Sequence, residues 1–180
     1  MTARSVLQHA DIARALTRIS HEILESDRGD SAHAPADLVL LGIPTRGVVL
    51  AQRLAELLNA AEAGSAVAGA LDVTMYRDDL ARHPTRVSSP TRIPEGGIGG
   101  KTVVLVDDVL YTGRTIRAAL DALGDTGRPR AVRLAVLVDR GHRDLPIRAD
   151  FVGKNLPSSH SERINVRLSE TDGADEVTIE

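Results

Sequence analysis

The stretch VVLVDDVLYTGRT, residues 103–115, decides the fold class, because an apolar run of strand length passes directly into two acids and then into a small polar loop. The acids are Asp107 and Asp108. The loop TGRT precedes a segment whose apolar residues recur at helical spacing from Ile116 onward. A buried strand, a short loop and a helix in this order are typical of an α/β domain with a parallel sheet.

Other segments extend this pattern along the chain. LVLLGI (38–43) predicts a second buried strand, which PTRG joins to a helix over residues 48–60. AVRLAVLVD (131–139) predicts a third strand, after a helix over 116–127 that ends at a glycine. We expect residues 66–76 to form a strand pair or one long irregular strand. An amphipathic N-terminal helix is predicted from the spacing of Ile12, Leu16, Ile19 and Ile23.

Length and composition indicate a single domain, residues 1–180, with an aliphatic core. The chain has 180 residues, of which 42% are apolar and only three are aromatic. The absence of cysteine excludes disulfides, thiolate metal sites and a cysteine nucleophile. No apolar run is long enough to cross a membrane, so we expect a cytoplasmic protein.

Charge is distributed unevenly along the chain. Residues 128–167 hold nine Lys or Arg and four Asp or Glu, whereas residues 168–180 hold five acids and no base. This layout predicts a basic region followed by an acidic C-terminal tail. A solvated surface and a basic binding face both explain the basic region.

The loop after the first quoted strand has the chemistry of a phosphate site. Ligands of open α/β sheets bind beyond the carboxyl ends of the strands, where loops enter helices. Backbone N–H groups at a helix N-terminus attract phosphate, Gly113 permits close approach, and Thr112 and Thr115 offer hydroxyls. Asp107 and Asp108 can accept hydrogen bonds from sugar hydroxyls or hold waters of Mg²⁺. A phosphate beside a diol indicates a ribose phosphate.

Three other interpretations of these residues are weaker. EGGIGGKT (95–102) resembles a P-loop, but Glu95 replaces the first glycine and a strand is predicted where a helix belongs. No G-x-G-x-x-G follows a strand, which argues against a dinucleotide-binding dehydrogenase. If the two acids merely ended a strand, the TGRT loop would be unexplained.

The quoted stretch resembles the phosphoribosyl pyrophosphate (PRPP) signature of type I phosphoribosyltransferases. ALTRISHEI, GIPTRGV, TMYRDDL and LVDRGHRDLPIRADFVGKNLPSS resemble one branch of them, the PyrR family of pyrimidine-operon regulators with uracil phosphoribosyltransferase activity. The resemblance implies the type I fold: a central, mostly parallel sheet flanked by helices, a flexible flap over about 77–101, and a small hood over about 140–166. The acidic tail, 168–180, follows the hood.

The family reaction converts uracil and PRPP to UMP and pyrophosphate, with Mg²⁺ as cofactor held mainly by PRPP and water. The resemblance implies catalytic roles for Asp107, Asp108 and Arg46, with the two aspartates on the ribose hydroxyls and as possible Mg²⁺ contacts, and no dedicated metal cage. It implies that PRPP is bound by Thr45, Arg46, Gly47, Arg77, Arg86, Asp107, Asp108, Val109, Leu110, Tyr111, Thr112, Gly113, Arg114 and Thr115. Candidates for reading uracil or a uridine nucleotide are Asp139, Arg140, Lys154, Asn155 and Leu156.

The family also binds the leader of pyrimidine (pyr) messenger RNA, with UMP or UTP strengthening the interaction. Candidate RNA-binding residues are Arg18, His21, His142, Arg143, Arg148 and Lys154, whose charges would contact phosphates in a salt-dependent manner. Relatives form dimers and higher assemblies, so we expect a homo-oligomer and no membrane partner. Two alternatives stay open: transfer to another base such as a purine, and an RNA-binding regulator whose catalysis is vestigial.

Overall fold

Five parallel strands form the central sheet of the chain. The computed structural model describes residues 3–28, 37–82 and 88–180. The strand order is β3-β2-β4-β5-β6, and every neighbouring pair is parallel. The strands are β2 (Leu38–Gly42), β3 (Ala66–Ala70), β4 (Thr102–Leu110), β5 (Ala131–Asp139) and β6 (Phe151–Asn155). The expected α/β class with a parallel sheet is confirmed.

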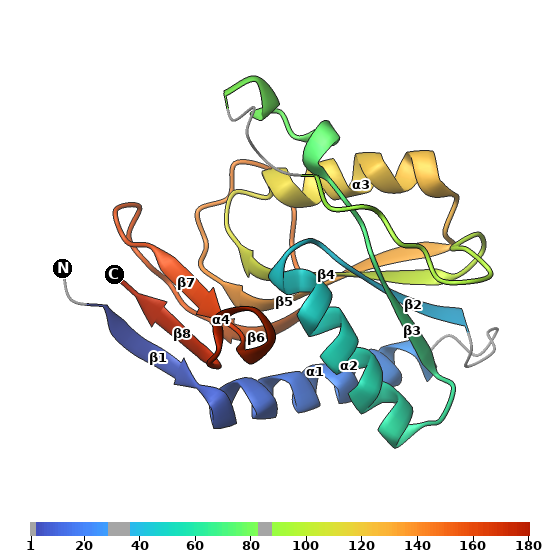
Figure 1. Cartoon of the computed structure of the whole chain (residues 1–180), viewed down its shortest axis with the longest axis horizontal. Coiled ribbons are helices and arrows are strands. Elements are labelled where there is room, and N and C mark those ends of the chain that lie inside the picture. Colours follow the sequence, from blue (N-terminus) through green and yellow to red (C-terminus); the bar gives the residue numbers. More distant parts are fainter. Residues whose placement is uncertain (1–2, 29–36, 83–87) are drawn as a thin grey trace.

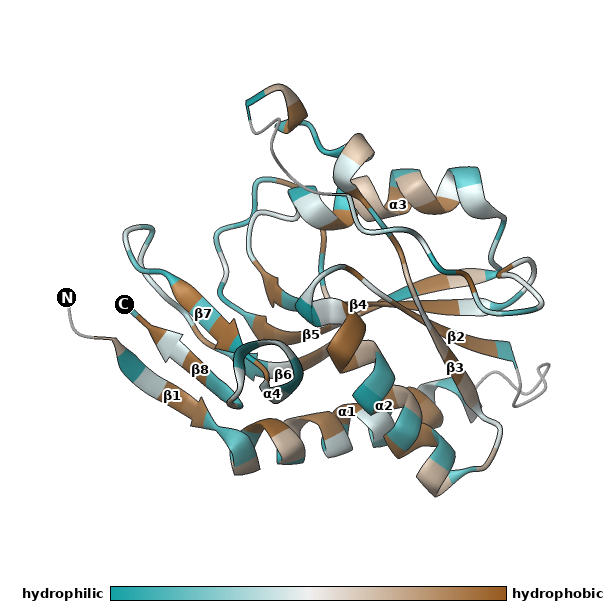
Figure 2. Ribbon diagram, in the orientation of Figure 1, coloured by the Kyte–Doolittle hydropathy of each residue, from teal (hydrophilic) through white to brown (hydrophobic). Residues whose placement is uncertain are grey.

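Helices cover both faces of this sheet. α1 (His9–Arg28) and α2 (Arg46–Ala61) lie on one face, and α3 (Arg114–Thr126) lies on the other (Figure 1). Because both faces are covered, the strands are mainly hydrophobic along their length (Figure 2), and every residue of β2 is buried. α3 ends at Gly127, whose N–H donates to the Leu123 carbonyl, as the sequence predicts.

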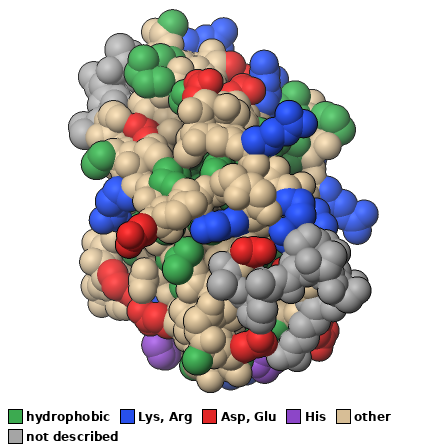
Figure 3. Space-filling view, turned by 90° about the vertical axis from the view of Figure 1, so that its right-hand side faces the viewer, with side chains coloured by type: hydrophobic (Ala, Val, Ile, Leu, Met, Phe, Trp, Pro, Cys, Tyr) green, Lys and Arg blue, Asp and Glu red, His purple; other side chains and the backbone are tan. Residues whose placement is uncertain are grey.

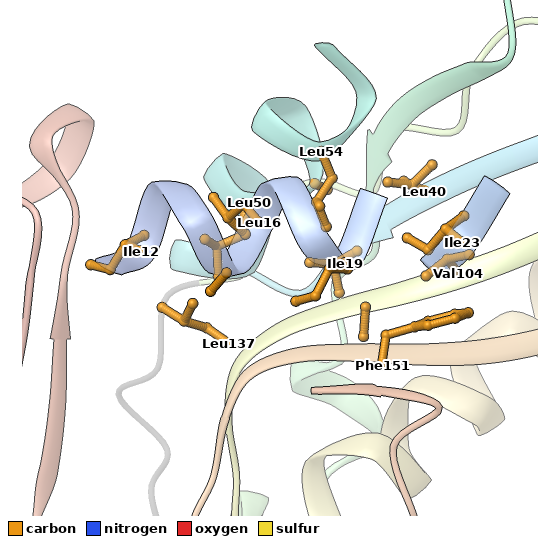
Figure 4. Packing of buried hydrophobic residues seen from close by; sticks show 14 of the residues in the cluster. Ile12, Leu16, Ile19, Ile23, Leu40, Leu50, Leu54, Val104, Leu137 and Phe151 are labelled. Carbon is orange, nitrogen blue, oxygen red and sulfur yellow. The ribbon is translucent and has the colours of Figure 1, made fainter. Parts of the chain in front are cut away.

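The apolar stripe of α1 forms the larger of two cores. Ile12, Leu16, Ile19 and Ile23 are at most 3% exposed, which confirms the helical spacing. Figure 4 shows how they meet residues of α2 and of the sheet, namely Leu50, Leu54, Leu40, Val104, Leu137 and Phe151. A second core lies between α3 and the opposite face of the sheet.

The termini build a small antiparallel sheet that the sequence analysis does not predict. Its order is β1-β8-β7, from β1 (Arg4–Gln8), β8 (Glu176–Ile179) and β7 (Ile164–Arg167), with α4 (Ser169–Asp172) before β8. Both chain ends lie together at this sheet (Figure 1). The acidic segment 168–180 is therefore folded, with Leu168, Val177 and Ile179 buried, and is not a solvated tail.

The region between β3 and β4 is only partly regular. The prediction of a strand pair or one long irregular strand over residues 66–76 is wrong: β3 ends at Ala70, and the 3-10 turn η2 (Thr74–Tyr76) follows. The expected flap begins at Arg77 and contains a second 3-10 turn, η3 (Leu80–Arg82). Its returning limb joins the end of β3 through an isolated antiparallel bridge between Arg92 and Ala70.

None of the described helices is long and apolar enough to cross a membrane.

The strand order creates a switch point between β2 and β4. The chain leaves β2 toward β3 on one side and enters β4 on the other, so the loops after β2 and β4 diverge above the sheet.

The opposite edge of the sheet, where the strands begin, faces the viewer in Figure 3, with Lys and Arg side chains across its middle. EGGIGGKT lies at that edge and leads into β4, so it lacks the helix of a P-loop.

Two glycines let α2 approach the sheet at the switch point. A Cβ atom at Gly47 would stand 2.4 Å from the Val106 carbonyl oxygen, and one at Gly42 would stand 2.3 Å from the Gly47 carbonyl oxygen. Such distances are far inside van der Waals contact. The first turn of α2 can therefore touch β4 only because neither residue has a side chain.

We expect Gly47→Ala to lower the free energy of unfolding by about 1–3 kcal/mol, since backbone must move to admit the methyl group. The matched control is Gly124→Ala on the exposed face of α3, where a Cβ would meet nothing within 4 Å. That change should raise stability by about 0.5–1 kcal/mol. Urea unfolding measures both, and a Gly47→Ala midpoint at or above that of the unsubstituted chain would contradict the packing argument.

Candidate functional site

Two adjoining cavities open at the carboxyl edge of the sheet. The larger measures about 580 Å³ and is lined by the loop after β4, the first turn of α3 and the start of the flap. The smaller measures about 350 Å³ and is lined by the loop after β2, the region after β3 and the acids of β4. Four residues line both cavities, which makes them one composite site: Arg77, Asp107, Val109 and Thr115.

The TGRT loop lies where the sequence places it, at the N-terminus of α3. Gly113 adopts φ 93°, a left-handed conformation that favours glycine, and a Cβ there would press on Ile147. The N–H groups of Asp144 and Leu145 donate to the Thr112 carbonyl at 2.9 and 3.1 Å, so the loop after β5 supports this turn. Residues 109–116 line the larger cavity without interruption. The loop therefore offers helix N-terminal N–H groups to an anion.

Asp107 and Asp108 both belong to β4 but differ in environment. Asp107 is 8% exposed and Asp108 is half-buried. The Asp107 carboxylate accepts the Asp108 N–H at 2.9 Å, and the Asp108 carboxylate accepts the Val109 N–H at 2.8 Å. Burial raises the pKa of Asp107 well above its usual value, and the neighbouring Asp108 charge adds to this rise.

Arginine side chains connect the start of the flap to the TGRT loop. Arg77 binds Asp79 at 2.9 Å and donates to the Thr115 hydroxyl at 3.1 Å. Arg114 binds Asp78 at 2.6 Å. Arg77 and Arg114, both expected to contact PRPP, thus lie together at the larger cavity. The other flap candidate, Arg86, lies outside the described residues.

The loop after β2 contributes Thr45 to the smaller cavity, whereas Arg46 lines neither cavity. The Arg46 guanidinium instead forms a bidentate pair with Asp172 of α4, at 2.8 and 3.1 Å. Hydrogen bonding from Arg46 lowers the pKa of Asp172 to about 2. Gly47 is buried directly above β4. The structure brings the backbone of this loop to the site but turns the Arg46 side chain toward the C-terminal segment.

The hood candidates converge at the ends of β5 and β6. Asp139 pairs in register with Asn155, Lys154 pairs with Val138, and the Leu156 N–H donates to the Asp139 carbonyl at 2.8 Å. The Asp139 carboxylate binds Arg143 at 2.5 Å. Arg143 also donates to the carbonyls of Tyr111 and Ile147, so it braces the wall of the site.

Arg140 and Tyr111 form a stacked pair that spacing alone does not reveal. The Arg140 guanidinium lies 4.1 Å from the centre of the Tyr111 ring and donates to the Ser159 carbonyl at 2.7 Å. Arg140 is 7% exposed, and its Nε has no hydrogen-bond partner in the described part of the chain. His142 contacts His160 with ring centres 3.8 Å apart and ring planes tilted by 47°. Tyr111 lines the larger cavity, whereas Arg140 lines neither cavity.

The candidate RNA-binding residues do not form one continuous group. Arg18 and His21 are exposed on the outer face of α1, and Arg18 donates to the carbonyls of Val152 and Gly153, next to Lys154. His142 and Arg143 line neither cavity. Arg143 lies behind Tyr111, to whose carbonyl it donates, and His142 binds the Ser158 carbonyl. Arg148 is exposed in the loop before β6.

Sequence reasoning missed Asp72, which follows β3 at the same edge of the sheet. Its carboxylate accepts the Thr74 hydroxyl at 2.6 Å and also the Ser88 hydroxyl, and it lines the smaller cavity. Its N–H donates to the Thr91 hydroxyl, so this residue connects η2, which precedes the flap, to the returning limb of the flap. The signal available was its place after a strand, since polar residues at the carboxyl ends of parallel strands gather at one edge.

Comparison with known proteins identifies the family of this chain. Residues 2–169 match the family described as "Phosphoribosyl transferase domain". A protein named "Bifunctional protein PyrR" from Leifsonia xyli subsp. xyli is 70% identical over 185 residues, which cover 100% of this chain and 98% of that protein. The chain belongs to the PyrR family of phosphoribosyl transferases. A second member, from Streptomyces coelicolor, is 62% identical and covers 98% of this chain and 89% of its own length.

Solved structures with this fold are phosphoribosyltransferases of distant sequence. The hypoxanthine phosphoribosyltransferase of Trypanosoma cruzi superposes with a TM-score of 0.72 at 16% identity, covering 98% of this chain and 95% of that one. An HGPRT-ase from Leishmania tarentolae, in complex with GMP, gives a TM-score of 0.70 at 16% identity, covering 99% and 97%. At this identity the structural similarity establishes the type I fold of this PyrR family member. It carries no information about the base that the protein uses.

The raised pKa of Asp107 predicts that Asp107→Asn stabilises the fold increasingly as pH rises. Below about pH 4 the carboxyl is protonated in both the folded and unfolded chains. Above that pH the unfolded chain loses its proton first, so the unsubstituted protein loses stability that the asparagine variant keeps.

Urea midpoints between about pH 5 and about pH 8 measure this difference. Asp121→Asn on α3 is the control at an exposed position. If the urea midpoints of Asp107→Asn and of the unsubstituted chain changed with pH in parallel, burial of the Asp107 carboxylate would not cost stability.

Proposed function

We propose that this chain is a uracil phosphoribosyltransferase that also regulates pyrimidine biosynthesis genes by binding pyr messenger RNA in response to uridine nucleotides. The observation that carries the proposal is the acid pair of β4 beside the α3 phosphate loop, at the switch point of a PyrR family member. The reaction transfers the ribose 5-phosphate of PRPP to a uracil nitrogen. The bond from C1 to the pyrophosphate oxygen breaks, the bond from C1 to nitrogen forms, and the nitrogen loses its proton.

PRPP occupies both cavities in this proposal. Residues 112–115 hold the 5′-phosphate at the α3 N-terminus, and Asp107 and Asp108 accept hydrogen bonds from the ribose hydroxyls. Val109, Leu110 and Tyr111 complete the wall of the larger cavity. Thr45 and Gly47 present backbone to the pyrophosphate in the smaller cavity. The catalytic contribution comes from positioning the two reactants and from stabilising the charge that develops as pyrophosphate leaves.

Basic side chains neutralise the departing pyrophosphate. Arg77 already lines both cavities. Arg46 has a planar fork of donors that suits pyrophosphate oxygens, once it leaves Asp172. Arg86 would act from the flap. Closure of the flap would exclude water and so protect the activated ribose from hydrolysis.

Mg²⁺ is the cofactor we infer for PRPP. The smaller cavity supplies carboxylate oxygens from Asp72, Asp107 and Asp108, which are ligands this ion prefers. Within the described residues, no group of three or more His, Cys, Asp or Glu is arranged to hold a metal. The ion would therefore be held mainly by pyrophosphate and water, and when bound it would neutralise charge on the leaving group.

Uracil is read at the hood. Arg140 and Tyr111 form a stacked wall, and the unpartnered Nε of Arg140 is a donor for a base carbonyl. Asp139 and residues 154–156 supply polar groups at the ends of the adjoining strands. A site that reads a base by hydrogen bonds rejects a base that cannot form them, because the wrong base leaves polar groups of the site unpaired. UMP and UTP would use the same pocket when they control RNA binding.

RNA binding in this proposal uses the outer face of α1 and the neighbouring β6. Arg18, His21 and Lys154 lie there. The candidates His142 and Arg143 contact the wall of the nucleotide pocket, so in this proposal they lie between the catalytic site and the RNA-binding face.

We further propose that the protein is cytoplasmic and assembles as a homodimer or larger oligomer.

The first test measures pyrophosphate release from PRPP and Mg²⁺ with uracil, hypoxanthine, guanine and orotate in parallel. We expect release with uracil alone. Asp107→Asn combined with Asp108→Asn should abolish release while the protein stays folded, because the ribose hydroxyls lose their acceptors. Release with a purine alone would replace the assigned base, and no release with any base would leave an RNA-binding regulator with vestigial catalysis.

The second test separates RNA binding from surface charge in general. Arg18→Ala should weaken binding to a pyr leader RNA and reduce the slope of log affinity against log salt by about 1. Arg128→Ala removes the same charge at the opposite edge of the sheet and should change neither. A melting curve checks that loss of the Arg18 contacts with β6 leaves the fold intact. Equal effects of the two substitutions would contradict a binding face on α1.

A further inference from the structure

Two arginines of α2 clamp the acidic C-terminal segment. Arg46 pairs with Asp172 at 2.8 and 3.1 Å. Arg53, two turns along the helix, binds Glu170 at 2.8 Å and Asp175 at 2.8 Å. In Figure 1, α4 lies beside the first turns of α2. The segment is thus attached to α2, which begins directly after the loop that follows β2. That loop is the one proposed to bind pyrophosphate.

Asp172 is oriented by its own turn as well as by Arg46. The Leu168 N–H donates to its carboxylate at 2.9 Å, and the Thr171 hydroxyl donates at 2.8 Å. The Asp172 side chain is 19% exposed and the Arg46 side chain is 35% exposed. A carboxylate held in this way presents two oxygens to the guanidinium fork. Phosphate oxygens present the same pattern, so both groups can occupy the same donors.

We propose that Asp172 is a competing counter-ion for Arg46, which holds the guanidinium in the free protein and yields it to the pyrophosphate group of an incoming ligand. This inference rests on the proposed function, because it requires pyrophosphate in the smaller cavity. Thr45, the residue before Arg46, lines that cavity, whereas Arg46 lines neither cavity. Asp172 therefore occupies the donors that the ligand needs.

The contact sets the affinity of the site for pyrophosphate-bearing ligands. Only molecules in which Arg46 has left Asp172 offer the complete donor set, so the apparent affinity is the intrinsic affinity multiplied by that fraction. The multiply charged pyrophosphate offers more oxygens than one carboxylate, which makes the exchange favourable. The same competition would speed pyrophosphate release, since Asp172 recaptures Arg46 as the product leaves.

The two halves of the clamp come from parts of the chain that are far apart in the sequence. The match to the phosphoribosyl transferase family ends at residue 169. Glu170, Asp172 and Asp175 all follow that point, and they supply the carboxylates that bind Arg46 and Arg53. The matched domain thus supplies the arginines, and the segment beyond it supplies their counter-ions.

The test is Asp172→Asn, which removes the charge and keeps the shape of the side chain. We expect calorimetric titration of the full-length chain with Mg²⁺-pyrophosphate to show binding about three- to tenfold tighter than in the unsubstituted protein. The KM for PRPP should fall by a similar factor, while the KM for uracil should not change. Pyrophosphate binding needs no turnover, so the titration tests this inference even if no base supports UMP synthesis.

Three further variants make the outcome decisive. Glu170→Gln breaks a contact of the same segment with Arg53 and leaves Arg46 untouched, so pyrophosphate affinity should not change. Asp172→Asn should give no gain when Arg46→Ala is already present. Asp172→Glu keeps the charge but moves it one methylene further out. Its affinity for pyrophosphate should lie between that of the unsubstituted chain and that of Asp172→Asn. It serves as the folded variant if the asparagine change unfolds the protein. Weaker or unchanged pyrophosphate binding by Asp172→Asn would overturn the inference.

Discussion

The burial of the Asp107 carboxyl at the carboxyl end of β4 is the constraint on which the rest of the site depends. A carboxylate among the strands of a parallel sheet loses hydration, and its raised pKa records that cost. The fold tolerates it because the same end of the sheet collects N–H donors and arginines. The Asp108 N–H reaches the carboxylate at 2.9 Å, and Arg77 lines the same cavities. The stability lost at this carboxyl leaves a hydrogen-bond acceptor in place at the cavities.

Close backbone approach is the second requirement of the site. Gly42 and Gly47 let the first turn of α2 meet β4, and this meeting brings the loop after β2 next to the acids of β4. On the other side, the loop after β5 supports the phosphate loop through the Thr112 carbonyl. The two halves of the site come from loops whose strands neighbour each other across the switch point. The sheet order therefore determines which loops can share one substrate.

Arginine and carboxylate contacts connect the site to the surrounding protein. Arg143 braces the hood through Asp139, Arg114 joins the flap through Asp78, and Arg46 joins the C-terminal segment through Asp172. Several of these arginines are also candidates for substrate or RNA contact. A side chain that joins two segments couples the position of one segment to the position of the other.

The sequence by itself determined the α/β class, three of the central strands, the three long helices and the TGRT loop beside the acids, because each rests on local periodicity or on adjacent residues. The stretch from Val103 to Thr115 contains a whole functional unit, so its reading needed no tertiary information. Only the tertiary structure decided the partner of Arg46, the pairing of Arg140 with Tyr111, and the position of Asp72 at the smaller cavity. These depend on residues far apart in the chain. The small sheet of β1, β7 and β8 was also missed, since strands of four or five residues carry too little periodic signal, and pairing between the two termini has no local signature.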